Sequence, residues 1–473
     1  MHDASEIFLL KDNRAARTAE LGDVFSASFT KADIMRRFSA PQIIRRNRML
    51  ELGVLADDLT GGMMVASLLE REGVRCPLVT SAEALDNLAD DAEAVVIGRK
   101  IRLIPAADAA ADVQHSARGL LAKDTKRIYY KYCATFDSTD EGNIGPIGEA
   151  LMETLNTDRV TFCPAFPEYG ITIYQGRMFL GKIMLGESGK KFDPVTPMTN
   201  SNLVEVLQAQ SKAKVGLIPH SQLVAGKDAC NAYIDKQVAD GSNLFIIDAV
   251  DGDDATRIAE LTTDWPLTTG ADALPMFLAR TWLKDKGEVE QRRLLPPSPG
   301  YEAVVAGSCA VNTQRQVTHF EKHHPVFRVD LLEATEDSNY IDKIAAWAKE
   351  NIKDGPICVS TSADVEGVKR AQAKLGRDGA AALADDINGR SAAMLKELGV
   401  RKLVSVGGET SGQVFNALGI EQVQVSSFDN LSGGYCHEAG PDPMSLVLKA
   451  GGLGNEEFFF TALERMREAD AQG

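Results

Sequence analysis

The chain has 473 residues and a formal net charge of −16, from 67 acidic and 51 basic side chains. Hydrophobic residues make up 44% and charged residues 25%, a globular composition that excludes a disordered, collagen-like or disulfide-knotted chain and whose length predicts two or three domains. The absence of an eighteen-residue apolar run argues against a membrane-spanning segment, and the acidic charge argues against a nucleic-acid partner.

Residues 1–48 differ from the rest of the chain. They hold nine Arg or Lys and six Asp or Glu, a net charge of +3 against −19 for the remainder. The stretch lacks the apolar core of a signal peptide, and its six acids argue against a mitochondrial presequence. Met49 directly precedes the first apolar run. We therefore expect the working protein to start near Met49, with residues 1–48 as a peripheral or disordered extension or an artefact of start-site choice.

From residue 50 the pattern alternates between strands and helices. Apolar runs of strand length lie at 52–56, 76–80, 94–98, 128–131 and 160–162. Such runs, separated by helical patterns, are typical of an α/β domain with a mostly parallel sheet. Residues 170–185 predict a hairpin instead. We place this first domain at 49–240.

The second half of the chain repeats the same pattern. A strand is predicted at 243–248, and a charged and Pro-rich stretch at 284–300 has the composition of a linker. Further strands are predicted at 303–307, 357–361 and 402–406, each followed by a Gly/Ser/Thr turn and a helical stretch. The sequence thus predicts two α/β domains, with a connecting region at 241–300 and the second domain at 301–473.

The turn after the predicted strand 402–406 is the strongest local indication of a ligand site. It reads Gly407-Gly408-Glu409-Thr410-Ser411-Gly412, and a helix is predicted to begin near Ser411. Free backbone N–H groups at a helix N-terminus form an anion cradle. The alternative is a plain capped β–α turn. Further Gly-rich turns at 306–309, 432–434 and 451–454 favour a nucleotide-phosphate site in this domain.

Two adjacent carboxylates, Asp57 and Asp58, follow the first predicted strand. Ligands of open α/β sheets lie at the carboxyl ends of strands. A carboxylate there can accept a proton from a substrate hydroxyl or bind Mg²⁺. The alternative is that one of the aspartates caps the following helix.

A third polar segment follows the predicted strand 128–131. It holds Lys131, Asp137, Ser138 and Thr139, a set that can bind a polyhydroxylated ligand or merely form a capped turn. Arg102 follows the strand 94–98 together with Arg99 and Lys100, and is predicted to point to the same edge. Its guanidinium can hold a carboxylate in bidentate fashion, with a solvated basic cluster as the alternative.

Cysteine and histidine patterns do not predict a metal site. The seven cysteines are scattered and include no Cys-x-x-Cys pair, which predicts reduced thiols and a cytoplasmic protein. His319 and His323 have the spacing of one helix face, but no Glu directly follows His319 and no third ligand is near. A zinc site is therefore not expected, and the metal ligands remain unknown.

The ordered motifs resemble those of the four-carbon acid sugar kinase family, from about residue 50 to about 460. The motif 131–139 is most similar to that of the 3-oxo-tetronate 4-kinases. The resemblance is carried by Gly53–Gly61, Lys131–Thr139, Pro164–Pro167, Pro197–Thr199, Ala306–Cys309 and Gly407–Gly412.

This resemblance implies an N-terminal domain that binds an acid sugar and a C-terminal domain that binds ATP, with Mg²⁺ as the second cofactor. It implies transfer of the γ-phosphoryl group to a terminal hydroxyl of a four-carbon acid sugar such as 3-oxo-tetronate. The nucleotide would be held by Ser308, Gly407, Gly408, Glu409, Thr410, Gly451 and Gly454. The sugar site would comprise Asp57, Arg102, Lys131, Ser138 and Thr139, with Asp58 or Asp137 as the catalytic base. A homodimer is an open option for the assembly.

The sequence departs from the family pattern near the expected substrate site. Tyr169-Gly170-Ile171-Thr172 stands where the family commonly has Asn-Gly-Arg-Thr, and Asn200 replaces an acidic residue. Ile101 and Leu103 flank Arg102 in place of small polar residues. A branched acid such as 3-oxo-isoapionate, or threonate or erythronate, is therefore an alternative substrate. A non-catalytic small-molecule binding protein is the alternative of another class. A dehydrogenase is not expected, because the sequence has no Gly-x-Gly-x-x-Gly motif after the first predicted strand.

Overall fold

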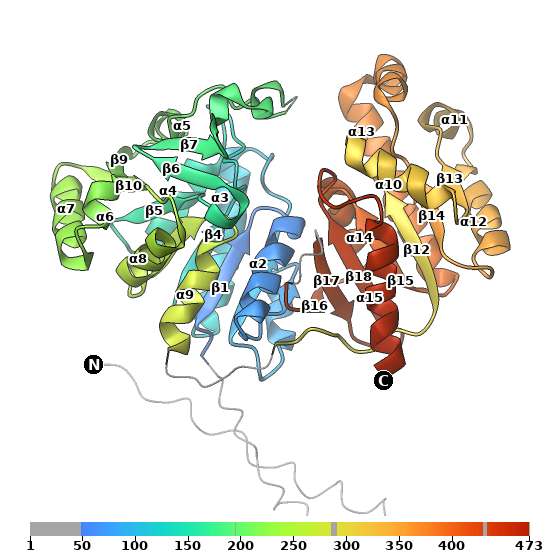
Figure 1. The fold of residues 1–473 in the computed structure, drawn as a ribbon, viewed down its shortest axis with the longest axis horizontal. Helices are drawn as coiled ribbons and strands as arrows, with labels where there is room; N and C mark the ends of the chain where they lie inside the picture. Colours follow the sequence, from blue (N-terminus) through green and yellow to red (C-terminus); the bar gives the residue numbers. More distant parts are fainter. Residues whose placement is uncertain (1–48, 194, 285–290, 429–432, 473) are drawn as a thin grey trace, which may run out of the picture. The chain divides into compact units, whose positions relative to one another are not determined.

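The computed structural model describes residues 49–193, 195–284, 291–428 and 433–472. These described residues form one compact unit. The predictions made for residues 1–48 lie outside the described residues. Figure 1 shows the strands and helices of this unit in chain order by colour.

The first half of the chain builds a sheet in which neighbouring strands run parallel. In spatial order its strands are β2 (Leu78–Val79), β3 (Ala94–Gly98), β1 (Leu52–Ala56), β4 (Ile128–Lys131), β11 (Leu267–Gly270), β5 (Val160–Cys163), β10 (Ser242–Ile247) and β9 (Lys214–Ile218). The helices are α2 (Leu59–Arg71), α3 (Ala106–Ala122), α4 (Ile144–Leu155), α5 (Leu203–Gln210), α6 (His220–Leu223), α7 (Lys227–Ala239), α8 (Gly252–Thr262) and α9 (Leu274–Leu283). Sheet and helices together confirm the predicted α/β class.

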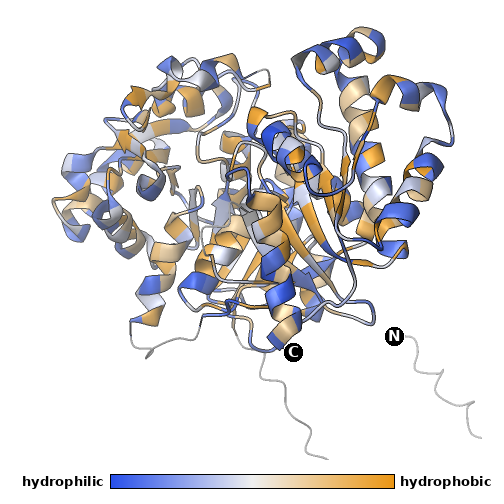
Figure 2. Ribbon diagram, turned by 45° about the vertical axis from the view of Figure 1, so that its right-hand side comes forward, coloured by the Kyte–Doolittle hydropathy of each residue, from blue (hydrophilic) through white to orange (hydrophobic). Residues whose placement is uncertain are grey.

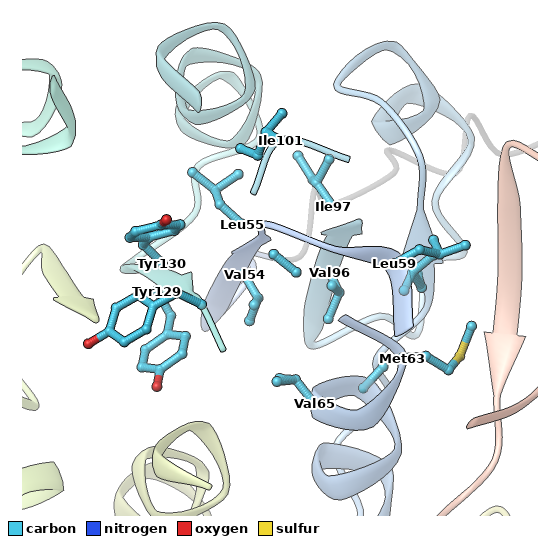
Figure 3. Close-up of a cluster of buried hydrophobic side chains, with 14 of the residues drawn as sticks. Val54, Leu55, Leu59, Met63, Val65, Val96, Ile97, Ile101, Tyr129 and Tyr130 are labelled. Carbon is cyan, nitrogen blue, oxygen red and sulfur yellow. The ribbon is translucent and has the colours of Figure 1, made fainter. Parts of the chain in front are cut away.

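The core of this half forms because β1 is apolar on both faces. All five of its residues are buried. In Figure 3, Val54 points to one side of the sheet, toward Val65, and Leu55 points to the other, toward Ile101. This alternation is the ordinary pleat of a strand, and a strand buried on both faces is typical of a parallel sheet under two helix layers. It leaves the polar residues after β1 at the carboxyl edge.

The second half of the chain forms a mixed sheet. Its strands, in spatial order, are β13 (Val326–Arg328), β14 (Ile357–Ser360), β12 (Tyr301–Ala306), β15 (Val400–Val406), β18 (Met444–Lys449), β17 (Gly433–Glu438) and β16 (Gln422–Val425). The strands from β13 to β18 are parallel, and β17 and β16 pair antiparallel. The helices are α10 (Val311–Glu321), α11 (Leu331–Glu336), α12 (Tyr340–Asn351), α13 (Val365–Glu397), α14 (Gly408–Leu418) and α15 (Phe458–Gln472).

The two sheets join edge to edge. Gln422 and Val423 of β16 pair antiparallel with Val79 and Leu78 of β2, so the described residues form one 15-stranded sheet. Figure 2 shows apolar residues concentrated along the strands and hydrophilic residues on the outer helices. Pairing the edge strands removes exposed backbone N–H and C=O groups from both sheets.

The strand order bears on the predicted end of the first domain at residue 240. The segment 241–300, predicted as a connecting region, contributes β10, β11 and α9 to the N-terminal half, and β11 lies between β4 and β5. Its strand Leu267-Thr-Thr-Gly270 is short and Thr-rich, so its apolar pattern is weak. We therefore propose that the first domain continues to Leu283.

Ser432 of the predicted Gly-rich turn at 432–434 lies outside the described residues, and Gly433 and Gly434 belong to β17. A Cβ on Gly434 would lie 1.6 Å from Cγ of Met63 in α2. This glycine therefore permits a close approach between the two halves of the chain and does not serve a ligand-binding turn.

The segment 170–185 is a hairpin as predicted. Strands β6 (Ile171–Tyr174), β7 (Arg177–Leu180) and β8 (Ile183–Met184) form a small antiparallel sheet. Short 3₁₀ turns accompany the main elements at Glu83–Asn87, Pro167–Tyr169, Leu185–Glu187 and Gly189–Phe192. Among the described residues no helix has the length and apolar character needed to cross a membrane.

Candidate active site

Charged residues meet at the carboxyl edge of the first sheet. Asp57 and Asp58 follow β1, Lys131 ends β4, and Asp272 is the second residue after β11. These three strands are adjacent and their last residues are in register. The parallel order therefore brings side chains from three distant parts of the sequence to one place, as open α/β sheets do at their ligand sites.

Arg102, in the loop after β3, is paired with both aspartates. Its Nε lies 2.8 Å from Oδ2 of Asp57, and its Nη2 lies 2.8 Å from Oδ1 of the same carboxylate and 2.7 Å from Oδ1 of Asp58. Asp57 is only 2% exposed. The bidentate edge that we predicted for a substrate carboxylate is thus engaged by Asp57, so a substrate would have to bind at Nη1 or displace Asp57.

Lys131 is enclosed between two carboxylates. Its Nζ lies 3.3 Å from Oδ1 of Asp58 and 3.4 Å from Oδ1 of Asp272, and the side chain is 3% exposed. A Cβ on Gly61 would lie 1.8 Å from this Nζ. Gly61, in the first turn of α2, therefore makes room for the ammonium group.

These contacts shift the protonation equilibria. Burial acts to raise the pKa of Asp58, but the charges of Arg102 and Lys131 outweigh it and hold that pKa well below its ordinary value. Burial acts to lower the pKa of Lys131, but Asp272 and Asp58 raise it. The pKa of Asp272 is raised, because burial outweighs the attraction of Lys131. Asp58 is therefore a firmly ionised carboxylate and Asp272 a more basic one.

Asp137 lies in the loop after β4 and has its own cation. Nζ of Lys190 is 2.8 Å from Oδ2 of Asp137 and 3.1 Å from Oδ2 of Asp193. The hydroxyl of Thr135 donates to Oδ1 of Asp137 at 2.6 Å. The side chain of Asp137 is 14% exposed, and these partners on both carboxylate oxygens hold it in place.

Ser138 and Thr139, also predicted for the sugar site, differ in accessibility. Ser138 is buried, and its Oγ accepts a hydrogen bond from Nε2 of Gln210 at 3.1 Å. Thr139 is exposed, and its carbonyl accepts a 3.5 Å hydrogen bond from the same amide. The hydroxyl of Ser138 thus helps to fix the loop, whereas that of Thr139 faces solvent.

The second half contains a cavity of about 700 Å³ at the carboxyl ends of β12 and β15. Five of the predicted nucleotide residues line it: Ser308, Gly407, Gly408, Glu409 and Thr410. Helix α14 begins at Gly408, three residues before the predicted start, so its free N–H groups face the cavity. This is the arrangement of an anion cradle.

Glycines are required at this turn for two physical reasons. Gly407 has φ 126°, a conformation that side chains rarely adopt. A Cβ on Gly307, after β12, would lie 2.2 Å from Oγ1 of the buried Thr410. Glycine at both positions therefore leaves room for the side chain of Thr410, which packs between the two turns.

Gly451 and Gly454, also predicted for the nucleotide, are not among the residues that line the cavity. A Cβ on Gly451 would lie 1.9 Å from Oγ of Ser308, and one on Gly454 would lie 2.8 Å from the ring of Phe458. Asn312 donates to the carbonyls of Gly452 and Gly454, at 2.8 and 3.1 Å. Gly451 thus permits the close approach of this turn to Ser308, and Gly454 permits its close approach to Phe458.

The rest of the cavity is largely apolar. Its lining includes Val329, Leu331, Leu332, Ala371, Ala380 and Ala381, with Arg328, Arg370 and Arg377 among the charged residues. The cavity extends along α13, which bends at Gly376 (φ 73°). A polar turn at one end and an apolar chamber at the other suit the phosphates and the base of a nucleotide.

One lysine connects the two halves of the site. Nζ of Lys100, two residues after β3, lies 2.6 Å from Oε2 of Glu409 and 3.7 Å from Oδ2 of Asp385, and both acids line the cavity. Asp385 lies in α13. Burial raises its pKa above the ordinary value, and the charge of Lys100 offsets only part of this effect. In the described ranges there is no group of three or more His, Cys, Asp or Glu arranged to bind a metal ion.

Sequence reasoning did not assign three of these residues. Asp272 follows the weakly patterned β11, Lys190 lies beyond a hairpin, and Asp385 lies within the 33-residue α13. Only the strand order and the position of α13 bring them to the site. A carboxylate directly after a strand was the one local sign, and it applies to Asp272.

Comparisons with known proteins agree with this geometry. A family model described as a sugar-binding N-terminal domain matches residues 52–278, and one described as a nucleotide-binding C-terminal domain matches residues 303–459. The chain is 36% identical over 417 residues to a 3-oxo-tetronate kinase of Burkholderia multivorans, covering 88% of this chain and 97% of the relative. It is 32% identical to one of Haemophilus influenzae, over 86% and 98%.

Solved structures show the same fold. A structure from Salmonella typhimurium LT2 has a TM-score of 0.75 at 33% identity, covering 88% of this chain and 99% of that one. Haemophilus influenzae protein HI1011 has a TM-score of 0.69 at 32% identity, over 87% and 99%. This chain therefore shares its two-domain architecture with almost the full length of each of these two solved structures.

Proposed function

The chain belongs to the four-carbon acid sugar kinase family and is a sugar-acid kinase, and from this premise we propose its reaction. ATP is the donor, and the γ-phosphoryl group passes to the terminal hydroxyl of a four-carbon acid sugar such as 3-oxo-tetronate. The relatives named 3-oxo-tetronate kinase support this substrate. 3-Oxo-isoapionate, threonate and erythronate are the alternatives.

One observation carries the proposal. A Gly-turn cavity of nucleotide size and a cluster of paired charges at a strand edge are joined by the 2.6 Å contact between Lys100 and Glu409. A kinase needs its donor and acceptor sites within reach of each other, because phosphoryl transfer depends mainly on positioning and charge neutralisation.

On the donor side, we assign the phosphates to the amides of the Gly407–Thr410 turn, with Ser308 beside them. The apolar lining around Leu331 and Ala371 would receive the adenine. Gly451 would act indirectly, by letting its turn approach Ser308, and Gly454 by letting the same turn approach Phe458. Backbone donors suit this task because their orientation is fixed before the ligand arrives.

On the acceptor side, Arg102 and Lys131 supply positive charge near a sugar carboxylate, while Asp57 holds Arg102 in place. Asp58 is too firmly ionised to be a strong proton acceptor, so we assign it to orienting the hydroxyl. Asp137 is then the remaining candidate for the base, and its loop after β4 begins at the strand that ends in Lys131. Thr139 and the loop fixed by Ser138 would complete the site.

Mg²⁺ is the expected second cofactor. Glu409 and Asp385 are oxygen ligands of the kind that Mg²⁺ prefers, and both lie at the phosphate end of the cavity. They would hold the ion together with the ATP phosphates, where it would neutralise charge on the β- and γ-phosphate oxygens.

A coupled ADP-release assay with 3-oxo-tetronates, threonate, erythronate and 3-oxo-isoapionate tests the substrate. We expect the highest kcat/KM with a 3-oxo-tetronate. A higher value with the branched acid would replace the four-carbon substrate. Tight binding of these acids without substrate-dependent ADP release would instead favour a non-catalytic binding protein.

The assignment of the base has its own test. Asp137→Asn is expected to lower kcat by 10²–10⁴-fold, the usual range for loss of a general base, and Asp58→Asn by a smaller factor. If both variants keep near-normal kcat, neither residue has the proposed role. Asp193→Asn, which removes the other partner of Lys190, is the matched control for loss of a carboxylate near this loop.

Location and assembly remain predictions. The seven cysteines are free in the structure, which agrees with reduced thiols in a cytoplasmic enzyme. A homodimer is the assembly that we would test first, by light scattering of the purified full chain.

A further inference from the structure

Lys100 belongs to the sugar-binding domain but contacts the nucleotide cavity. Its Nζ lies 2.6 Å from Oε2 of Glu409 and 3.7 Å from Oδ2 of Asp385, both of which line the cavity. The stem of the side chain rests on α14, because a Cβ on Gly412 would lie 3.9 Å from Cδ of Lys100. The ammonium group therefore stands at the phosphate end of the cavity.

The backbone around Lys100 is fixed on both sides. The amide of Arg99 donates to the carbonyl of Ala56 at 3.0 Å, and the amide of Ile101 donates to the carbonyl of Asp57 at 3.0 Å. Ile101 is buried in the core. The chain thus leaves β3 anchored to the end of β1, and the position of Lys100 is set by the same segment that carries Asp57.

The neighbouring arginines are bound within their own domain. Nη2 of Arg99 lies 2.6 Å from Oδ2 of Asp112, and Arg102 is paired with Asp57 and Asp58. Of these three basic residues, Lys100 is the one that reaches the nucleotide domain. Because it follows β3 by two residues, the acceptor site and this cation move together.

The ion pair between Lys100 and Glu409 can be replaced by a contact between Lys100 and a bound phosphate. Glu409 lies in the first turn of α14, where the free amides favour an anion. Lys100 is 48% exposed and Glu409 61%. An ion pair this exposed contributes little to stability, and lysine has a flexible stem. A triphosphate in the cradle carries more negative charge than the carboxylate and would compete for the same ammonium.

We propose that Lys100 is a catalytic residue, supplied by the sugar-binding domain, that leaves Glu409 to bind the transferring γ-phosphoryl group. This rests on the proposed kinase function. In the reaction the bond between the γ-phosphorus and the bridging oxygen of ADP breaks, and a bond to the sugar hydroxyl oxygen forms. The hydroxyl proton passes to a carboxylate of the acceptor site. Lys100 stays protonated and neutralises charge on the phosphoryl oxygens.

Lys100→Met tests this role directly. We expect kcat to fall by 10²–10³-fold, while KM for the sugar acid changes less than threefold. Lys100→Arg should recover part of the rate, because it keeps the charge. Lys123→Met is the matched control, since it removes another lysine paired with one carboxylate (Asp86, 2.6 Å) in the same domain. A kcat for Lys100→Met within threefold of the wild type would overturn the proposal.

Nucleotide binding separates this role from a merely structural one and does not depend on the identity of the sugar. In calorimetry, Lys100→Met should weaken a non-hydrolysable ATP analogue at least tenfold and ADP less than twofold. Equal weakening of both would mean that Lys100 does not bind the γ-phosphate and would overturn the proposal. A failure of every sugar acid to release ADP would refute the proposed function but leave this binding result interpretable.

Thermal unfolding distinguishes catalysis from an interdomain latch. Lys100→Met is expected to unfold within a few degrees of the wild type, because the ion pair that it removes is exposed. A large fall in the unfolding temperature would show that the pair mainly stabilises the contact between the two domains and would contradict the proposal.

Discussion

Arg102 donates two parallel hydrogen bonds to the carboxylate of Asp57, from Nε to Oδ2 and from Nη2 to Oδ1, each 2.8 Å long. The carboxylate is buried and the guanidinium is 26% exposed. Charge-assisted bidentate hydrogen bonds are stronger than neutral ones, and they also fix the relative orientation of the two groups. The pair therefore joins the ends of β1 and β3 and orients the loop that carries Lys100.

We expect Arg102→Met to destabilise the fold by about 3 kcal/mol, because it leaves a buried carboxylate without its partner. The double variant Arg102→Met/Asp57→Asn should lose less than the sum of the two single variants, since both remove the same interaction. Urea unfolding of the four proteins measures this coupling. Strict additivity would show that the pair contributes nothing to stability.

We expect Gly61→Ala to reduce activity without a large loss of folding stability. A Cβ at this position would lie 1.8 Å from Nζ of Lys131 and 2.4 Å from Oδ1 of Asp58, so the lysine must leave its place between the two aspartates. We expect kcat/KM for the sugar acid to fall at least tenfold. Gly379→Ala in α13, where the new Cβ meets only Cβ of Leu375 at 3.5 Å, is the control. It should be neutral, or stabilising by up to about 1 kcal/mol.

Adjacent glycines give a matched pair for the nucleotide site. A Cβ on Gly451 would lie 1.9 Å from Oγ and 2.7 Å from Cβ of Ser308, whereas one on Gly452 meets nothing within 4 Å. Gly451→Ala must push the turn away from Ser308, so we expect KM for ATP to rise about tenfold or more. Gly452→Ala should leave KM for ATP within twofold. Similar values for the two variants would show that the contact with Ser308 does not shape the ATP site.

The sequence predicted the parts of the site that depend on local pattern. Asp57 and Asp58 follow an apolar strand, and Gly407 interrupts a strand before a helix, so neighbours in the sequence suffice to place them at a strand edge. The two-domain α/β fold followed from the same repeated pattern, because runs buried on both faces require helices on either side.

Residues whose role depends on distant partners could not be found in this way. Asp272 contacts Lys131, which lies 141 residues earlier in the chain, only because β11 inserts beside β4. Asp385 lies on a long helix, where a single acid has the pattern of a solvated face. The pairing of Arg102 with Asp57 was also beyond reach, since a basic residue near an acid can equally hold a substrate. Long-range strand order decides the first and third cases, and the position of α13 decides the second.

Lys449 gives a prediction for pH. It ends β18 and is fully buried, and its Nζ donates to the carbonyls of Ala450 and Gly451 at 3.0 and 3.1 Å. Burial lowers its pKa from 10.5 to about 8. Below pH 8 the lysine binds a proton in both the folded and the unfolded chain, so its contribution is constant. Between about pH 8 and 10 only the unfolded chain keeps the proton, and stability must therefore rise with pH.

Comparison with Lys449→Met isolates this effect from other titrating groups. The free energy of unfolding of the wild type, relative to the variant, should be flat from pH 6 to 7. It should then increase by about 2–3 kcal/mol up to pH 10, because a tenfold change in proton affinity is worth about 1.4 kcal/mol. Urea unfolding at each pH measures the difference. A flat or falling difference above pH 8 would mean that the folded lysine keeps its proton. The carbonyls of Ala450 and Gly451 would then stabilise its charge.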